Sequence, residues 1–223
     1  SRIVNANTFG ASAHKLAGSA YTLEQIITAG IENCKRACAP YGALTALDVG
    51  PLGELLEPSG TLAFEDAVAE YARIVKAGEA AGADLIFFET YTDLYELKAA
   101  LLAAKENTHL PILASMSFEA GGRTFTGCTV ESFAATARGL GADAVGINCS
   151  LGPKEIFPMA KRLAEAVPGN FPVFVKPNAG LPRADGSGYD ITPQLFAMEM
   201  KPCRELHLFA AGGCCGTTPE FIK

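Results

Sequence analysis

Tryptophan is absent from this chain of 223 residues, and histidine occurs only three times. His14, His109 and His207 lie far apart without the close spacing of histidine metal ligands, so we expect them to be structural. Basic residues are also few: 18 lysines and arginines stand against 24 acidic residues, which gives a net charge of −6. Without a basic excess the chain lacks the electrostatic footprint of a nucleic-acid-binding protein.

Long apolar runs are missing too, since no stretch approaches the roughly 18 residues of a membrane span. The N-terminus lacks the order of basic, apolar and small residues that marks a secretion signal. The seven cysteines are odd in number and lack the short spacings of a disulfide framework. We therefore expect a cytoplasmic, reducing setting, with neither nucleic acid nor a membrane as partner.

What the chain does contain is an alternation of short apolar runs with longer amphipathic segments, the pattern of a parallel α/β protein. No proline-rich or serine-rich linker interrupts it, so we expect residues 1–223 to form a single domain. The predicted strands are Ile3–Asn7, Leu44–Asp48, Asp84–Glu89, Pro111–Ser117, Ala144–Asn148, Pro172–Lys176 and Leu206–Ala211. The predicted helices are Leu23–Cys38, Phe64–Ala81, Leu94–Lys105, Val130–Leu140 and Lys154–Val167.

Most of these predicted strands end in a polar or glycine-rich tail. In a parallel barrel such tails share one rim where ligands bind, whereas an open doubly wound sheet would focus its ligand at one switch point. Tails on nearly every strand favour a (β/α) TIM-type barrel. Because a barrel needs eight strands, we expect the first βα unit and most of the last helix to be missing. A start at Ser1 instead of Met fits a truncated chain.

The most informative motif is GGCCGTTPE at residues 212–220. Adjacent thiols add little to a core, and a disulfide between neighbours closes a strained ring, whereas thiolates bind zinc tightly. The flanking glycines permit a turn that lets Cys214 and Cys215 face one point. Cys149 is the natural third ligand, because it follows a predicted strand in GINCSLGP at residues 146–153. Three cysteines from two strand ends predict a catalytic type of zinc site with a free fourth position.

The other cysteines offer no clear fourth ligand. Cys203 falls before the last predicted strand and so toward the opposite rim. Cys128 shares no motif with the pair. Cys34 and Cys38 lie four residues apart on a predicted helix, so we expect them to be half-buried helix residues. A non-catalytic module with a structural zinc site, which would need four protein ligands, remains an alternative.

Two further alternatives concern the same rim. Lys176, at the end of a predicted strand, could form a Schiff base as in aldolases. The glycines at 212–213, before a predicted helix start, resemble a barrel phosphate site. Both alternatives leave the three cysteines unexplained, and the plainer reading of Lys176 is a lysine paired with a carboxylate.

The cysteine motifs resemble those of the zinc-dependent homocysteine S-methyltransferase family, whose hallmark is an Asn-Cys strand end and a distant Gly-Gly-Cys-Cys-Gly. The resemblance covers essentially the whole chain. The runs FETYTD (88–93), NCSLGP (148–153) and KPNAGLP (176–182) are most similar to the N-terminal homocysteine-binding module of cobalamin-dependent methionine synthase. This implies a barrel in which Cys149, Cys214 and Cys215 hold Zn²⁺ and methyl transfer to homocysteine gives methionine.

The resemblance also implies roles for other residues. Glu89 would take the substrate's ammonium, Asn7 and Thr8 would belong to the pocket wall, and Asn178 would lie over the metal and fill its open position without substrate. The family's first strand ends in an Asp-Gly pair whose Asp helps Glu89, and that strand is absent here.

The methyl donor is implied to be methylcobalamin, supplied with methyl groups from 5-methyltetrahydrofolate by cobalamin- and folate-binding domains or chains. Betaine or S-methylmethionine as donor is the alternative within the family. A barrel without one unit also exposes strand edges at Ile3–Asn7 and Leu206–Ala211, and such edges predict self-association.

Overall fold

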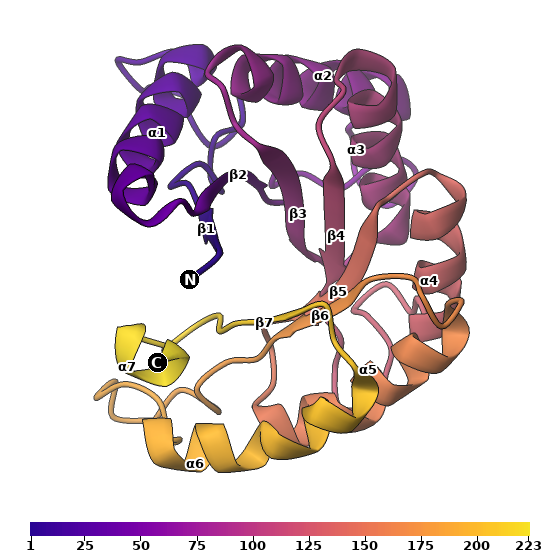
Figure 1. The fold of residues 1–223 in the computed structure, drawn as a ribbon. Coiled ribbons are helices and arrows are strands. Elements are labelled where there is room, and N and C mark those ends of the chain that lie inside the picture. Colours follow the sequence, from indigo (N-terminus) through magenta and orange to yellow (C-terminus); the bar gives the residue numbers. More distant parts are fainter.

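The computed structural model describes residues 1–223 as one curled parallel sheet whose outer side is covered by helices (Figure 1). The seven strands follow one another in chain order, and each neighbouring pair is parallel. The strands are β1 (Ile3–Asn5), β2 (Leu44–Val49), β3 (Leu85–Tyr91), β4 (Ile112–Met116), β5 (Ala144–Asn148), β6 (Val173–Lys176) and β7 (Ala210–Ala211).

Helices connect successive strands, as the amphipathic segments predict. Their starts have local causes: Thr22 and Gln25 form a capping box at the first helix, for example. The α-helices are α1 (Leu23–Cys38), α2 (Phe64–Ala80), α3 (Leu94–Asn107), α4 (Val130–Gly139), α5 (Pro153–Ala166), α6 (Pro193–Glu199) and α7 (Pro219–Ile222). Two 3₁₀ helices, η1 (Ala39–Tyr41) and η2 (Lys201–Leu206), complete the set. None of the helices is long and apolar enough to cross a membrane.

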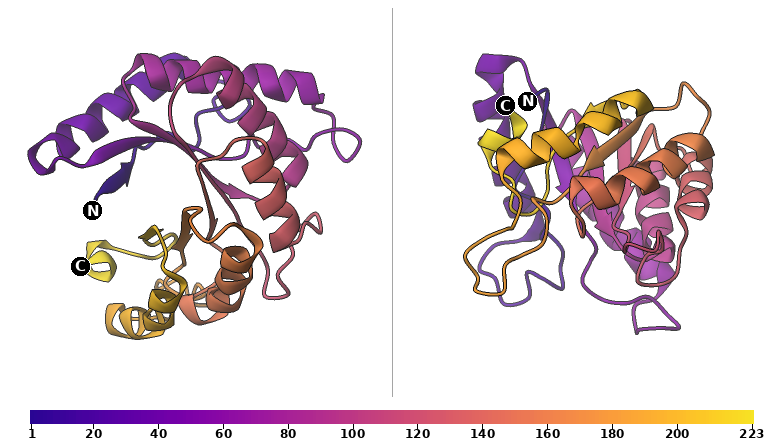
Figure 2. Two further views of the ribbon diagram at one scale, coloured as in Figure 1. Left: turned by 45° about the vertical axis from the view of Figure 1, so that its right-hand side comes forward. Right: turned by 90° about the horizontal axis from the view of Figure 1, so that it is seen from below.

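The sheet curls into an open barrel. Strands β1 and β7 are the two ends of the sheet, and the chain termini lie on the same side of the molecule, at the opening (Figure 2). The predicted TIM-type architecture with seven strands is confirmed, and so is the short helix that begins at Pro219.

Most predicted elements agree within two residues, and the main differences lie at the two ends of the sheet and in one added helix. Strand β1 ends at Asn5 instead of Asn7, and β7 keeps only Ala210–Ala211 of the predicted Leu206–Ala211. The start of that predicted strand is 3₁₀ helix up to Leu206, and His207 then turns with a left-handed φ of 48°. Helix α6 was not predicted; it is only seven residues long, and the Thr192 side chain caps its start by accepting from the Leu195 N–H.

Side chains alternate across the sheet and form two apolar clusters. Outward-facing residues such as Leu47 and Phe88 pack against the helices in the larger cluster of 44 buried residues. Inward-facing residues fill the barrel interior in a smaller cluster: Ala46, Leu85, Phe87, Leu113, Ala144 and Phe174. Toward the carboxyl ends of the strands, polar side chains replace the apolar ones on this inner face.

These inward-facing polar residues come one from each of strands β1 to β6, and together we call them the polar layer. Each directly follows a residue that faces the helices, so strand alternation directs it into the barrel. The polar layer consists of Asn5, Asp48, Glu89, Ser115, Asn148 and Lys176. The polar layer therefore lies above an apolar floor, at the carboxyl rim.

Candidate metal and substrate site

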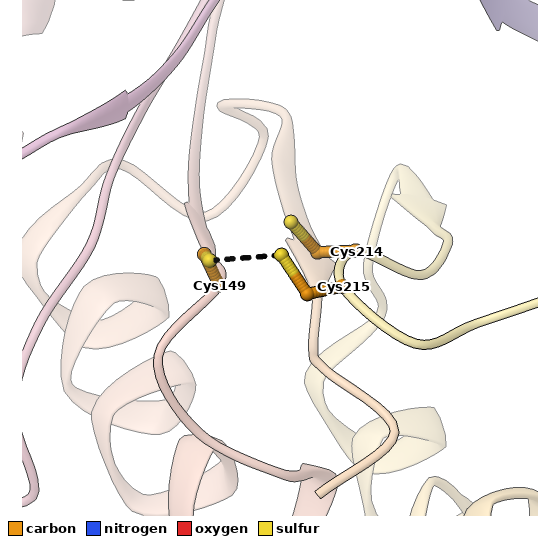
Figure 3. Close-up of side chains that lie close together, drawn as sticks. All are labelled: Cys149, Cys214 and Cys215. Carbon is orange, nitrogen blue, oxygen red and sulfur yellow. Dashed lines mark hydrogen bonds between the residues drawn. The ribbon is translucent and has the colours of Figure 1, made fainter. Parts of the chain in front are cut away.

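Three cysteines meet at the carboxyl rim (Figure 3). Cys149 follows β5, and Cys214 and Cys215 follow β7, so the sulfurs come from two strand ends on either side of β6. The three sulfur atoms all lie within 4.8 Å of one another, and the Sγ atoms of Cys149 and Cys215 are 3.7 Å apart. The structure thus brings together the three residues that the sequence singled out.

The tail of β6 fixes both cysteine segments. The Cys149 N–H donates to the carbonyl of Lys176 at 3.1 Å, and the Cys214 N–H donates to that of Pro177 at 2.8 Å. The Asn178 side-chain oxygen accepts from the Cys215 N–H at 3.1 Å. The oxygen that the resemblance places over the metal is thus used here to hold the turn of the cysteine pair, and Asn178 is buried.

The backbone is strained at the ends of β3 and β5. Thr90, Cys149 and Ser150 have positive φ angles of 67°, 65° and 61°, which are unusual for residues with side chains. The first of these accompanies a shift in the β3–β4 register between Phe88 and Tyr91. Strained conformations persist where surrounding contacts fix them, and they cluster at functional sites. The irregularity re-aims the end of β3 beside the cysteines.

Asn148 supplies the contacts that fix this region. Its side-chain oxygen accepts from the Thr90 N–H and from the Ser115 hydroxyl, both at 2.9 Å. Its Nδ2 donates to the Thr90 hydroxyl at 2.7 Å and to the Cys214 sulfur at 3.7 Å. This fully buried amide therefore connects three strand ends. Sequence reasoning missed it as a site residue, although its place directly before Cys149 in the motif was the available signal.

The thiols are electrostatically coupled. A hydrogen bond with Cys214 lowers the pKa of Cys149, and the same contact, followed by burial, raises the pKa of Cys214. Burial raises the pKa of Cys215. Because the three thiols lie so close together, ionisation of one is favoured. Ionisation of all three is unfavourable unless a cation compensates their charge.

The cluster fits a zinc ion. Thiolates are strong zinc ligands, and sulfurs at about 2.3 Å from one tetrahedral ion lie about 3.8 Å from each other. The separation of 3.7 Å between Cys149 and Cys215 agrees with that geometry. Cys203 is buried in η2 and Cys128 lies before α4, and neither belongs to the cluster. The three ligands leave one coordination position for another group.

Beside the cysteines, Glu89 and Lys176 form an ion pair through Oε2 and Nζ. Both side chains are mostly buried, at 10% and 17% exposure. The Lys176 ammonium also lies 4.5 Å from the centre of the Phe87 ring, in a cation–π contact. The lysine is therefore paired with a carboxylate, as the plainer interpretation of the sequence held.

Asp48 adds a second carboxyl group to the same layer. Its residue exposure is 7%, and its Oδ1 has no hydrogen-bond partner. Burial first, and then the charge of Glu89, raises the pKa of Asp48 well above its ordinary value, while Lys176 acts in the opposite direction. Sequence reasoning missed Asp48 because an acidic residue at a strand end has no motif.

Asn7 and Thr8, the two residues expected in the pocket wall, lie differently from each other. The Thr8 side chain is buried, donates to the Asp48 carbonyl at 2.8 Å and accepts from the Asp48 N–H at 3.1 Å. It therefore joins the end of β1 to β2. Asn7, next to it, is exposed.

Comparison with known proteins assigns the chain to a family. The sequence profile described as homocysteine S-methyltransferase matches residues 1–223. The chain belongs to the homocysteine S-methyltransferase family. Methionine synthase of Mycobacterium leprae (strain TN) is 35% identical over 150 residues, which are 64% of this chain and 12% of that protein. Methionine synthase of Mycobacterium tuberculosis (strain ATCC 25618 / H37Rv) is 36% identical over 150 residues, with the same two coverages.

Solved structures of this family show the same fold. The metallated form of the homocysteine methyltransferase MmuM from Escherichia coli superimposes with a TM-score of 0.80 at 21% identity, over 100% of this chain and 77% of that chain. The apo form of the same enzyme gives a TM-score of 0.74 at 22% identity, over 100% and 78%. The open parallel barrel of this chain therefore corresponds to most of a TIM-type barrel.

Proposed function

We propose that this chain is a zinc-dependent S-methyltransferase that acts on the thiol of homocysteine to form methionine. The observation that carries the proposal is the cluster of Cys149, Cys214 and Cys215, within 4.8 Å at the carboxyl rim of a barrel of this family. The similarity to methionine synthases and to a homocysteine methyltransferase supports it. Residues 1–223 would act as a single homocysteine-binding domain.

The three cysteines would hold the zinc ion. When bound, zinc supplies the Lewis acidity that keeps a thiol deprotonated at neutral pH. Three cysteine thiolates carry one more negative charge than the ion carries positive charge, so these residues keep the site electron-rich. Asn148 holds the Cys214 sulfur by its amide, and Asn178 holds the Cys215 backbone, so the cysteines are oriented before substrate arrives.

Glu89 would bind the ammonium of homocysteine from the polar layer, on the same carboxyl rim as the sulfurs. It transfers no proton; its carboxylate selects an amino acid over a simple thiol because only the amino acid offers an ammonium to pair with it. In the reaction, the homocysteine thiol gives up its proton and its sulfur attacks the methyl carbon of the donor. A sulfur–carbon bond forms, and the bond between methyl group and donor breaks with its electron pair staying on the donor.

The donor we propose is methylcobalamin, supplied with methyl groups from 5-methyltetrahydrofolate by cobalamin- and folate-binding domains or chains. The chain spans only 12% of the methionine synthases it matches, which leaves most of their length for other tasks. Betaine or S-methylmethionine is the alternative, supported by the likeness to a homocysteine methyltransferase of which this chain covers 77%. Methionine formation with each free donor in turn distinguishes them. A site built on three thiols also requires the reducing conditions of the cytoplasm, which is the location we propose.

Titration calorimetry on zinc-loaded protein tests the proposed substrate. Homocysteine should bind at least about a hundredfold more tightly than homoserine, which replaces the thiol by a hydroxyl, and each binding event should release a proton. Cys149→Ala should abolish this preference, while Cys128→Ala, at a cysteine outside the cluster, should keep it. Equal binding of homocysteine and homoserine to the wild-type protein contradicts the proposal.

A further inference from the structure

The charged members of the polar layer do not balance. Asp48 and Glu89 provide two carboxyl groups, and Lys176 provides one ammonium, all directed into the barrel. Asp48 and Glu89 come from the adjacent strands β2 and β3, and Lys176 reaches Glu89 from β6, across the curled sheet. Beneath them lies the apolar floor that contains Phe87 and Phe174. Above this apolar floor each charged group needs a partner of opposite charge, because an unpaired buried charge costs free energy.

Lys176 occupies the carboxylate that would receive the substrate. Its Nζ contacts Glu89 Oε2, and the ring of Phe87 supports the ammonium from the floor. A lysine ammonium is chemically the same group as the α-ammonium of an amino acid, and its four-carbon stem rotates freely. The ammonium of an amino acid therefore competes with Lys176 for Glu89.

Asp48 offers a place for the displaced lysine. It is more than nine-tenths buried, and its Oδ1 accepts no hydrogen bond in a region where an unpaired acceptor costs free energy. The charge of Lys176 already acts on this carboxyl group, and lowers its pKa. A second ammonium in the layer favours the ionised form of Asp48 further.

We propose that Lys176 is a displaceable stand-in for the substrate's ammonium: it pairs with Glu89 in the free protein and moves to Asp48 Oδ1 when an amino acid binds Glu89. The proposal rests on the proposed function, in which the substrate is an amino-thiol. In the bound state two ammonium groups face two carboxylates, and the layer is balanced. A thiol without an ammonium cannot displace the lysine, so the exchange makes Lys176 and Asp48 determinants of specificity.

Calorimetry with two ligands tests the exchange on zinc-loaded protein: homocysteine, and 4-mercaptobutanoate, which is homocysteine without its amino group. Asp48→Asn keeps the shape of the side chain but removes the charge that receives Lys176. It should weaken homocysteine binding about tenfold, and leave 4-mercaptobutanoate binding within about twofold. Lys176→Met removes the competing ammonium and should strengthen homocysteine binding about tenfold.

The combination of the two substitutions is decisive. In the Lys176→Met background, Asp48→Asn should have no effect on homocysteine binding, because no lysine remains to be received. In a Lys176→Arg background, which keeps the charge, Asp48→Asn should still weaken it. Equal losses for both ligands in Asp48→Asn, or the same loss with and without Lys176, overturn the exchange. Because Asp48→Asn is nearly isosteric, the comparison of the two ligands stands even if Lys176→Met fails to fold.

Failure of the exchange and failure of the proposed function give different results. If the exchange is wrong, both thiols still bind the zinc-loaded wild-type protein and only the effects of the variants differ. If the proposed function is wrong, neither thiol binds the wild-type protein, and the exchange is overturned with it.

Discussion

At the scale of single residues, Asn148 holds the site together more than any other side chain outside the cysteines. Its amide makes hydrogen bonds to Thr90, Ser115 and Cys214, and one of these holds a residue with positive φ. Asn148→Ala would leave several buried groups unpaired at once. We expect it to lower the free energy of unfolding by about 2–3 kcal/mol, measured by urea denaturation.

A matched control exists on helix α3. The Asn107 side chain donates a single hydrogen bond to the Ala103 carbonyl, at a helix end and only partly buried. Asn107→Ala should therefore cost less than about 1 kcal/mol. Equal losses for the two alanine variants would show that the contacts of Asn148 do not act as described.

Glu96 carries a prediction about pH. One of its oxygens accepts from the Leu52 N–H at 2.7 Å and from the Tyr71 hydroxyl at 2.9 Å. Burial raises the pKa of Glu96 above its ordinary value of 4.5, so the folded protein holds this proton more tightly than the unfolded chain does. The stabilisation is present below pH 4.5 and is lost as the pH rises through the raised value.

Glu96→Gln keeps the accepting oxygen but removes the ionisation. The free energy of unfolding of this variant, relative to the wild-type protein, should therefore rise between pH 4 and pH 7 by urea denaturation. Parallel pH profiles for the two proteins would refute this role of Glu96.

At the scale of elements, the loop before α6 covers the cysteine pair at Gly216. This glycine has a φ of 78°, and a Cβ there would collide with the ring of Tyr189. Gly216→Ala must therefore strain the backbone and push the ring aside, and we expect both lower stability and weaker zinc retention against a chelator.

Gly127→Ala is the control, because Gly127 also has positive φ, at 90°, but faces open space. Gly127→Ala should cost only the strain of about 1–2 kcal/mol and should leave zinc retention unchanged.

Equal zinc retention in Gly216→Ala and the wild-type protein would mean that the Tyr189 loop does not position the cysteine pair.

The helices and strands also show how much of the fold could be predicted from the sequence. Helices with a long apolar stripe, such as α1, and strands with buried runs, such as β5, are predicted within a residue or two. Helix α6 is too short for periodicity to reveal, and the last strand was predicted too long, since only Ala210–Ala211 of Leu206–Ala211 pairs. The cysteine site was readable because adjacent thiols have few other uses.

The polar layer could not be predicted from the sequence in the same way. It depends on strand register, which places Asp48 and Lys176 near Glu89 although they lie 41 and 87 positions from it in the sequence. A lone acidic residue at a strand end carries no signal of such a neighbour. Asn178 is a second example, since its motif could be recognised but its contact with the Cys215 backbone could not.

At the scale of the whole molecule, the open sheet leaves two unpaired strand edges. Because Arg2 and Ala6 bond to β2, the alternate residues Ile3 and Asn5 direct their backbone groups away from it. We expect this chain to self-associate at micromolar concentration by light scattering, since such an edge pairs readily with another strand.

Ile3→Pro removes an outward-facing N–H while leaving the groups that bond to β2, and should shift the chain toward the monomer. A strictly monomeric wild-type chain over this concentration range would refute the prediction.

The central claim is that Cys149, Cys214 and Cys215 hold one zinc ion whose free position takes the thiol of homocysteine. The most direct test measures bound zinc per chain, and counts sulfur neighbours of the metal by X-ray absorption with and without homocysteine, on protein purified under reducing conditions without chelator. We predict about one zinc per chain, lost in Cys149→Ala, with three sulfur neighbours that become four when homocysteine is added. A well-folded chain that binds no zinc, or a sulfur count that homocysteine does not change, would contradict the claim.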